Sequence, residues 1–207
     1  MRVAFIGTHG TGKSTATNFI VGKRQLLRLY RYPEYAREIL DCITMYDPDF
    51  DWMKCIKTNP MIYTMFELSI VDLYEDQSVS DNYVADRTPL DIMAYIQNFV
   101  NVVFPKSENK ERPEIIDILL KKAWGKCNSI LESTTYDLVF FLRAVDGDKT
   151  RMFIDKYIES NLDKLKYYKL VELQEKPDLN KVLEIFDKEA DQYYSRSASQ
   201  LRKQITL

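Results

Sequence analysis

The sequence predicts an α/β fold, in which helices cover both faces of a parallel β-sheet. Short apolar segments of strand length alternate with longer amphipathic segments of helical length along the chain. Such alternation is typical of parallel sheets, because two parallel strands must be joined by a crossover, usually a helix. Three of the six glycines fall within residues 7–12, directly after the first apolar segment. Since ligands bind at the carboxyl ends of parallel strands, this loop is the first candidate for a site.

The size and composition of the chain indicate one globular domain. No internal repeat and no linker divides the 207 residues, so we expect a single domain over residues 1–207. Hydrophobic residues make up 45% and charged residues 29%, which suits a packed core and excludes a disordered tail or a fibre. The formal net charge of -2 provides no general attraction to nucleic acid or to acidic membranes.

The cysteines and the apolar runs indicate a cytoplasmic protein. Cys42, Cys55 and Cys127 are odd in number and lack metal-ligand spacing, so neither a disulfide framework nor a zinc site is expected. The apolar residues 3–6 are too few for the core of a secretory signal. No run approaches the roughly 18 residues that span a bilayer, so we expect no membrane partner.

Five short apolar segments are expected to form the strands of the sheet. The fourth is the most apolar in the chain, and Pro33 closes the second. The expected strands cover residues 3–6, 26–32, 82–85, 138–142 and 168–173.

Six longer segments have the spacing of apolar residues that is typical of amphipathic helices. The helix that begins after Thr88 carries a start signal, with Thr88 as N-cap, Pro89 at the first helical position and Asp91 in the first turn. Residues 46–52 are expected to be irregular, and residues 106–112 to form a polar surface loop. The expected helices cover residues 14–23, 35–42, 61–77, 88–99, 113–133 and 179–193.

The glycine-rich loop GTHGTGKST fills the template G-x-x-x-x-G-K-[ST] between a strand and a helix. Glycines allow consecutive backbone N–H groups to turn inward around phosphate oxygens, and the helix directs its positive end at the same anion. Lys13 is expected to reach the β- and γ-phosphates, and the Ser14 hydroxyl to ligate Mg²⁺. The loop therefore predicts a nucleoside triphosphate site made of Gly7, Thr8, His9, Gly10, Thr11, Gly12, Lys13, Ser14 and Thr15.

Two other classes of phosphate-loop protein are disfavoured by what the sequence lacks. A GTPase would carry N-K-x-D for guanine and D-x-x-G after the magnesium strand, and the chain has neither. Translocating motors carry further glycine-rich signatures, which are also missing. A small kinase, which binds ATP and a second substrate in one chain, remains.

The chain resembles the P-loop nucleoside and nucleotide kinases, especially the group around bacterial ribosylnicotinamide kinase and phage-encoded (deoxy)nucleotide kinases. Four segments carry the resemblance in order: GTHGTGKST, EYAREI, ADRTPLDIMAY and YDLVFFLRAVDGDKTR. The resemblance implies a P-loop NTPase fold with a five-stranded parallel sheet of order 2-3-1-4-5. It also implies a lid over the phosphates at about residues 143–166, with ATP and Mg²⁺ as cofactors.

The same resemblance assigns Glu34 and Arg37, just after the second strand, to the γ-phosphate and the acceptor. In related nucleoside kinases an acid at this place takes the proton of the acceptor hydroxyl, a role that suits a carboxylate. The alternative is that Glu34 is a surface acid that favours the start of its helix.

Asp86 and Arg87 end the third strand, where the resemblance places the metal and the transferred phosphate. Asp86 is expected to hold a Mg²⁺-bound water and Arg87 to neutralise phosphate charge. An ordinary surface ion pair is the alternative. Asp91 is expected either to contact the substrate or to cap its own helix.

Arg143 and Arg151 follow the fourth strand, in the segment expected to be the lid. Arg151 is expected to act in catalysis and Arg143 to contact ATP, because charge spreads over the transferring phosphoryl group and water must be excluded. The alternative is a solvated run of charges around Gly147. Trp52 is expected either to stack on an acceptor base or to lie in a packing loop.

Together these features predict an ATP-dependent kinase whose acceptor is a nucleoside or a (deoxy)nucleoside monophosphate. A kinase that acts on a modified base or an end of DNA is an alternative, although the charge balance makes nucleic acid a less expected partner. A P-loop binding module switched by nucleotide, without acceptor chemistry, is another. A homodimer is compatible with all three.

Overall fold

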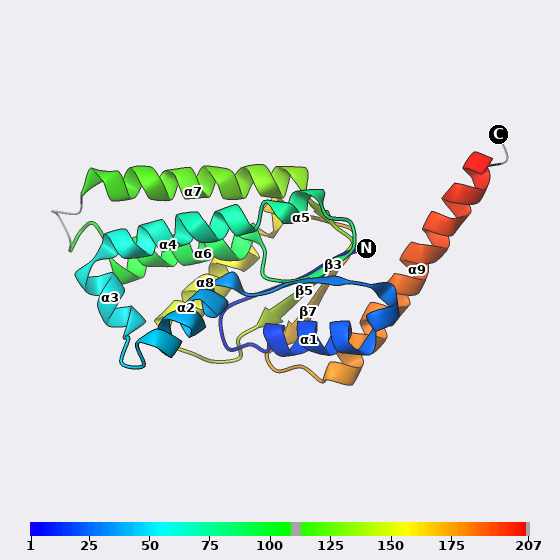
Figure 1. Cartoon of the computed structure of the whole chain (residues 1–207), viewed down its shortest axis with the longest axis horizontal. Helices are drawn as coiled ribbons and strands as arrows, with labels where there is room; N and C mark the ends of the chain where they lie inside the picture. The colour runs from blue at the N-terminus through cyan, green and yellow to red at the C-terminus, as the bar shows by residue number, and fades with distance from the viewer. Residues whose placement is uncertain (109–112, 206–207) are drawn as a thin grey trace.

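The computed structural model describes residues 1–108 and 113–205, and a five-stranded parallel sheet forms its centre (Figure 1). The strand order is β2-β3-β1-β5-β7, which is 2-3-1-4-5 when these five strands are counted along the chain. The expected P-loop NTPase order is therefore confirmed. The strands are β1 (Arg2–Ile6), β2 (Tyr30–Tyr32), β3 (Tyr83–Asp86), β5 (Leu138–Arg143) and β7 (Leu170–Gln174).

Alternate side chains of the central strands enter two separate cores. In β1, Val3 and Phe5 face one core, whereas Ala4 and Ile6 face the other. This follows from the pleat of a strand, which turns successive side chains to opposite faces. The helices α1 (Lys13–Lys23) and α9 (Leu179–Ile205) cover the first face.

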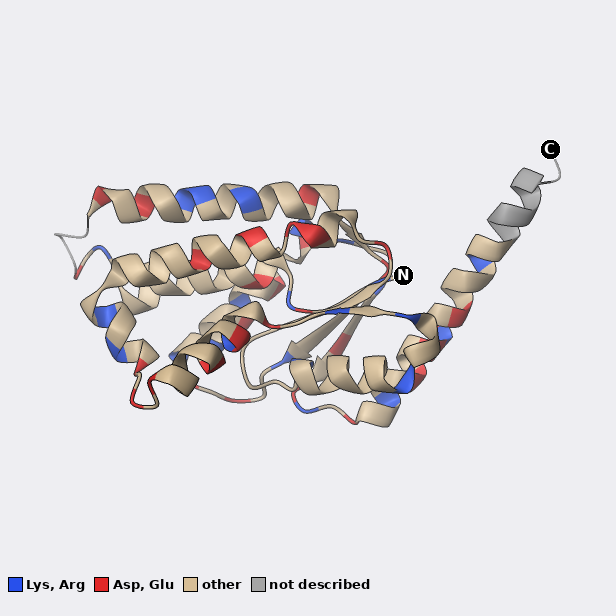
Figure 2. Cartoon of the chain, in the orientation of Figure 1, with Lys and Arg blue, Asp and Glu red and all other residues tan. Residues whose placement is uncertain are grey.

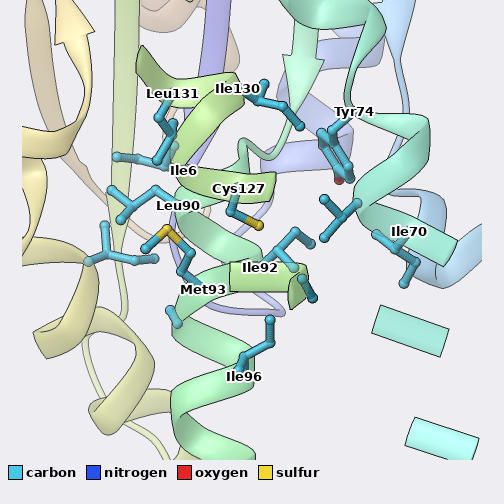
Figure 3. Packing of buried hydrophobic residues seen from close by; sticks show 14 of the residues in the cluster. Ile6, Ile70, Tyr74, Leu90, Ile92, Met93, Ile96, Cys127, Ile130 and Leu131 are labelled. Carbon is cyan, nitrogen blue, oxygen red and sulfur yellow. The ribbon is translucent and has the colours of Figure 1, made fainter. Parts of the chain in front are cut away.

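The second face carries the larger core, which helices from the middle of the chain cover. Figure 3 shows side chains from three different helices that point into this one core, among them Leu90, Met93, Cys127, Ile130 and Ile70. These side chains are at most 5% exposed, so their burial stabilises the fold by about 1.5–3 kcal/mol for each large apolar residue. The covering helices are α2 (Tyr35–Tyr46), α3 (Trp52–Thr58), α4 (Pro60–Leu73), α6 (Pro89–Asn98), α7 (Glu114–Ser133) and α8 (Lys149–Ser160).

The second strand is shorter than the sequence predicts. Residues Gln25–Leu27 form a 3-10 turn instead, and Leu26 is 97% exposed. Arg28 follows with a left-handed backbone (φ 50°), which ends the turn and redirects the chain into β2. The expectation of a strand over residues 26–32 is therefore wrong for its first half.

Three further elements differ from the expected ones. The predicted helix over residues 61–77 is broken near Tyr74, where α4 ends, and α5 (Asp76–Val79) follows. Helix α3 begins at Trp52, directly after the irregular residues 47–51. The strands β4 (Thr135–Tyr136) and β6 (Lys166–Tyr167) form a small parallel ladder, which is too short to leave a periodic pattern.

The exterior of the protein mixes both signs of charge. Figure 2 shows basic and acidic residues interspersed along α7 and α9 rather than gathered on one element. Helix α9 extends from the body of the protein at its carboxyl end (Figure 1). Among the described residues, no helix has the length and apolar character needed to cross a membrane. Residues 109–112 of the expected loop 106–112 lie outside the described residues.

Candidate active site

The phosphate loop joins the end of β1 to the start of α1. Gly7, Gly10 and Gly12 all have positive φ values, of 130°, 76° and 95°. Gly7 has a second constraint, because a Cβ there would lie 2.4 Å from the carbonyl oxygen of Leu142 in the neighbouring β5. The glycines therefore permit both the curvature of the loop and its close approach to the sheet.

Lys13 lies inside this loop and is 3% exposed. Its ammonium group donates to the carbonyl oxygen of Thr8 and to the hydroxyl of Thr11, the latter at 3.2 Å. Burial, followed by the charge of Arg87, lowers the pKa of Lys13 to about 8. The loop oxygens and nearby carboxylates thus hold a buried cation where the sequence predicts phosphates.

Asp86 is fully buried, and neither of its carboxylate oxygens has a hydrogen-bond partner among the described residues. The pleat of β3 turns Asp86 to the same face as Val84, toward α1, where Ser14 lies nearby. Burial raises the pKa of Asp86, against the opposing influence of Lys13 and Ser14. Two unpartnered oxygens beside a hydroxyl fit Mg²⁺, which prefers oxygen ligands.

The described residues contain no cluster of three or more His, Cys, Asp or Glu side chains that could hold a metal ion by themselves. Mg²⁺ is usually held by one or two protein groups, with water and phosphate oxygens completing its shell. Asp86 and Ser14 fit this kind of site.

Glu34 and Arg87 form a buried ion pair. Arg87 donates to Oε1 of Glu34 from Nε at 2.9 Å and from a second nitrogen at 2.5 Å. Burial raises the pKa of Glu34, but the charges of Arg87 and Lys13 outweigh it and hold that pKa below its usual value. Arg87 itself has a φ of 111°, a strained backbone for a side-chain-bearing residue, of the kind that clusters at functional sites.

Asp91 caps its own helix, which is one of the two roles expected for it. Its carboxylate accepts from the backbone N–H of Thr88 at 2.8 Å and from that of Gly7 at 3.0 Å. With Thr88 it completes the capping box of α6, and it is fully buried. These bonds hold Asp91 between the helix start and the phosphate loop, and contact with the substrate stays a prediction.

Asp155 is a residue that the sequence reasoning missed. One of its oxygens accepts from the backbone N–H of Thr8 at 3.0 Å and the other from that of Ala144 at 2.6 Å. Helix α8 is thereby bonded to both the phosphate loop and the end of β5. Asp155 is only 8% exposed, beside the buried Ile154 and Ile158, and this burial shows only in the folded structure.

Two cavities meet at this group of residues. The smaller, of about 230 Å³, lies along the phosphate loop. The larger, of about 410 Å³, has a mainly aromatic wall that includes Trp52, Tyr63 and Phe99. Glu34 and Arg37 line both cavities, so the carboxylate stands at their boundary. The lining of the smaller cavity is Gly10, Gly12, Lys13, Ser14, Thr15, Glu34, Arg37 and Lys176.

Three residues that the sequence assigns to nucleotide binding or catalysis, His9, Arg143 and Arg151, do not line the smaller cavity in the described structure. His9 lines the larger cavity, not the smaller one, and its Nδ1 is 3.2 Å from the hydroxyl of Tyr95. Arg143 is bonded to Glu159 and Glu172, and its guanidinium lies over the ring of Phe141.

Arg151 forms an ion pair with Glu175, just before Lys176, and is 17% exposed. In the part of the chain that the structure describes, neither Arg143 nor Arg151 lines the smaller cavity.

Glu67 and Asn98 are polar residues of the larger cavity that the sequence reasoning also missed. Each is 4% exposed, and one oxygen of each has no partner within the described residues. Burial raises the pKa of Glu67 to about 7, although the Tyr63 hydroxyl and the Arg87 charge oppose this.

The protein is similar to known proteins in sequence and in structure. The family described as an AAA domain (AAA_28) matches residues 2–157, about three quarters of the chain. No curated protein matches the sequence.

Among solved structures, deoxyadenosine kinase from M. mycoides with bound dCTP superposes with a TM-score of 0.60 at 13% identity. The same enzyme with dCMP and a flexible dCDP gives a TM-score of 0.56 at 14% identity. Each match covers 93% of this chain and 100% of the other, so these structures share its fold.

Proposed function

The chain belongs to the AAA domain family, and from this premise we propose that it is an ATP-dependent phosphotransferase that acts on a nucleoside or a (deoxy)nucleoside monophosphate. One observation carries the proposal: Glu34 stands at the boundary of a phosphate-loop cavity and an aromatic cavity. A phosphoryl donor bound in the first cavity and a phosphoryl acceptor bound in the second would meet at this one carboxylate. We call the larger one the acceptor cavity.

Glu34 is the group that would take the proton of the acceptor hydroxyl. Its lowered pKa keeps it ionised at neutral pH. A carboxylate of this kind suits phosphoryl transfer, because the transition state is loose and the hydroxyl proton leaves late. Arg87 orients Glu34 through two hydrogen bonds from one guanidinium, and Arg37, 3.5 Å from the other carboxylate oxygen, lies in both cavities.

The phosphate loop supplies the positive charge that would bind the phosphates of ATP, the phosphoryl donor. Lys13 would exchange its bonds to Thr8 and Thr11 for bonds to phosphate oxygens, which are better acceptors for a buried ammonium group. Ser14 and Asp86 would hold Mg²⁺, and the metal when bound neutralises charge on the β- and γ-phosphates.

The segment at residues 143–166 is proposed to act as the lid of this single domain. Its helix α8 brings Thr150 to the acceptor cavity, and Asp155 binds the phosphate loop. Arg151 would have to leave Glu175 to reach the phosphates. Since Gly147 lies against Arg151, with a positive φ of 151°, a movement of this arginine would begin at that glycine.

The similar structures support a nucleoside-type acceptor. They are structures of deoxyadenosine kinase with dCTP and with dCMP and dCDP, and the enzyme is matched over its full length. At 13–14% identity that support concerns the kind of acceptor, and the base must be identified from the cavity of this chain.

The experiment is a transfer assay with γ-labelled ATP and Mg²⁺ against a panel of nucleosides, nucleoside monophosphates and DNA oligonucleotides. The proposal expects label on one or more nucleosides or monophosphates, and none on the oligonucleotides. Labelled DNA would favour the nucleic-acid kinase instead. Nucleotide binding without transfer to any acceptor would overturn the proposal in favour of a nucleotide-switched binding module.

A further inference from the structure

Two buried oxygen atoms of the acceptor cavity have unused hydrogen-bonding capacity. They are Oε2 of Glu67 and Oδ1 of Asn98, and neither has a partner among the described residues. Both side chains come from residues that line this one cavity, although they belong to different helices. A buried polar group without a partner costs about 1–3 kcal/mol, so a ligand that bonded to both would gain from satisfying them.

Asn98 lies at the end of helix α6 that is remote from the phosphate loop. Helix α6 begins at that loop, where Asp91 binds Gly7, and Asn98 is the last residue of the same helix. Seven residues of α-helix span about 10 Å, which separates Asn98 from the loop. Glu67 belongs to α4, which packs on α6, and lines the same cavity.

The walls near the pair are aromatic. Tyr63 and Phe99 stack with their ring centroids 4.1 Å apart, and Trp52 packs on Phe66 at 4.7 Å. All four rings line the acceptor cavity together with Tyr95. Aromatic walls around a few polar groups are suited to a flat heterocycle, whose faces are apolar and whose edge carries hydrogen-bonding atoms.

The chemistry of the two side chains defines the edge that they would bind. The Asn98 amide donates and accepts, with its unpartnered oxygen as an acceptor. Burial keeps Glu67 uncharged in a large share of molecules at neutral pH, and an uncharged carboxylic acid also donates and accepts. A complementary edge therefore presents a donor and an acceptor on adjacent atoms.

We propose that Glu67 and Asn98 recognise the base of the acceptor, through an edge on which a hydrogen-bond donor and an acceptor stand side by side. This inference rests on the proposed function. It makes the two residues specificity-determining groups of the acceptor cavity. An acceptor without a base would leave both groups unpaired, and sites of this kind discriminate strongly against such ligands.

The experiment compares nucleosides whose bases differ only in the order of the hydrogen-bond donor and the hydrogen-bond acceptor on one edge. Deoxycytidine is paired with deoxyuridine, and deoxyadenosine with deoxyinosine, since an amino group becomes a carbonyl in each pair. The inference expects the wild type to prefer one member of at least one pair by tenfold or more in kcat/KM. Glu67→Leu and Asn98→Leu should each reduce that ratio to within about threefold, mainly through KM.

Three further variants keep the test decisive. Glu67→Gln retains a donor and an acceptor, so it should retain most of the selectivity. Met65→Leu, on the exposed side of the same helix, serves as the matched control. If Glu67→Leu does not fold, Glu67→Met takes its place, and Asn98→Leu provides an independent result.

The outcomes separate this inference from the proposed function. If the wild type phosphorylates nucleosides but Glu67→Leu and Asn98→Leu keep its base selectivity, the inference is wrong and the kinase proposal stands. If the wild type shows no preference within either pair, the inference is also wrong. If it phosphorylates no nucleoside and no monophosphate, both proposals fail.

Discussion

Nε of Arg87 donates to Oε1 of Glu34 at 2.9 Å, and both side chains lie almost wholly inside the protein. The bond joins the end of β3 to the start of α2 across 53 residues of sequence. Because an arginine stays charged at any physiological pH, it keeps its carboxylate partner ionised and in a fixed orientation. The pair therefore presents an ionised carboxylate of fixed orientation at the boundary of the two cavities.

Replacement of Glu34 by Gln should separate chemistry from nucleotide binding. The amide keeps the size of the side chain but cannot take a proton, so the transfer rate should fall about 10²- to 10⁴-fold. ATP affinity should change little. Single-turnover transfer and ATP titration would measure the two effects, with Glu38→Gln, an exposed acid on the same helix, as control. A Glu34→Gln enzyme with wild-type transfer would remove Glu34 from the chemistry.

Asp86→Asn should give a defect that depends on the metal concentration. An amide oxygen is a weaker Mg²⁺ ligand than a carboxylate, so the variant should need more Mg²⁺ and recover part of its rate at high Mg²⁺. A Mg²⁺ series with single-turnover transfer tests this, and Glu34→Gln should show no such recovery. The same loss at every Mg²⁺ concentration would argue against a metal role for Asp86.

Lys13→Ala should weaken both ATP binding and turnover. The cation is buried within the phosphate loop and is expected to serve both the ground state and the transition state. We expect at least a hundredfold loss of rate, which corresponds to about 2.7 kcal/mol. Lys181→Ala, at an exposed position of α9, provides the control. Near-normal transfer by Lys13→Ala would contradict the kinase proposal as a whole.

Asp155→Ala should loosen the phosphate loop without touching either substrate directly. The change leaves the N–H groups of Thr8 and Ala144 without their acceptor, at about 1–3 kcal/mol for each buried group. Thermal unfolding should show lower stability, and ATP affinity should fall because the loop is less ordered. Asp163→Ala, outside this network, is the comparison, and an unchanged melting temperature for Asp155→Ala would exclude the bridging role.

Glu67 should make the free energy of unfolding depend on pH in a defined direction. Its pKa is raised from the ordinary 4.5 to about 7 in the folded protein, so between these values the folded state holds a proton that the unfolded chain has lost. Stability from this group is therefore greatest below about pH 4.5 and falls as the pH rises toward about 7, by on the order of 3 kcal/mol.

Urea unfolding of the wild type and Glu67→Gln at several pH values isolates this contribution, because other groups titrate alike in both proteins. The difference in unfolding free energy, wild type minus variant, should fall with rising pH. A difference that stays constant would mean that Glu67 keeps its ordinary pKa.

The sequence was informative where a local requirement dictates the residue. Gly7 is recognisable because the curved loop and the close carbonyl of Leu142 leave no room for a side chain. The capping box of α6 is similarly local, since Thr88 and Asp91 serve backbone groups within one turn. Such requirements appear as residue types at fixed spacing.

Features that depend on tertiary packing escaped prediction. Leu26 has the composition of a strand residue, yet nothing covers it in the described structure and it lies in a turn. Glu67, Asn98 and Asp155 are polar residues whose burial comes from neighbours far away in sequence. Only the assembled fold shows that they lack water and face a cavity or a loop.

The position of Glu34 and Arg37 in the walls of both cavities ties the two binding equilibria together. Any factor by which bound nucleotide changes acceptor affinity is matched by an equal effect of the acceptor on nucleotide affinity. Negative charge that arrives in the phosphate-loop cavity also opposes the ionisation of Glu34, and so makes it a stronger base. On the proposed function, bound nucleotide would therefore increase the basicity of the carboxylate that takes the acceptor proton, and without nucleotide that carboxylate would stay a weaker base.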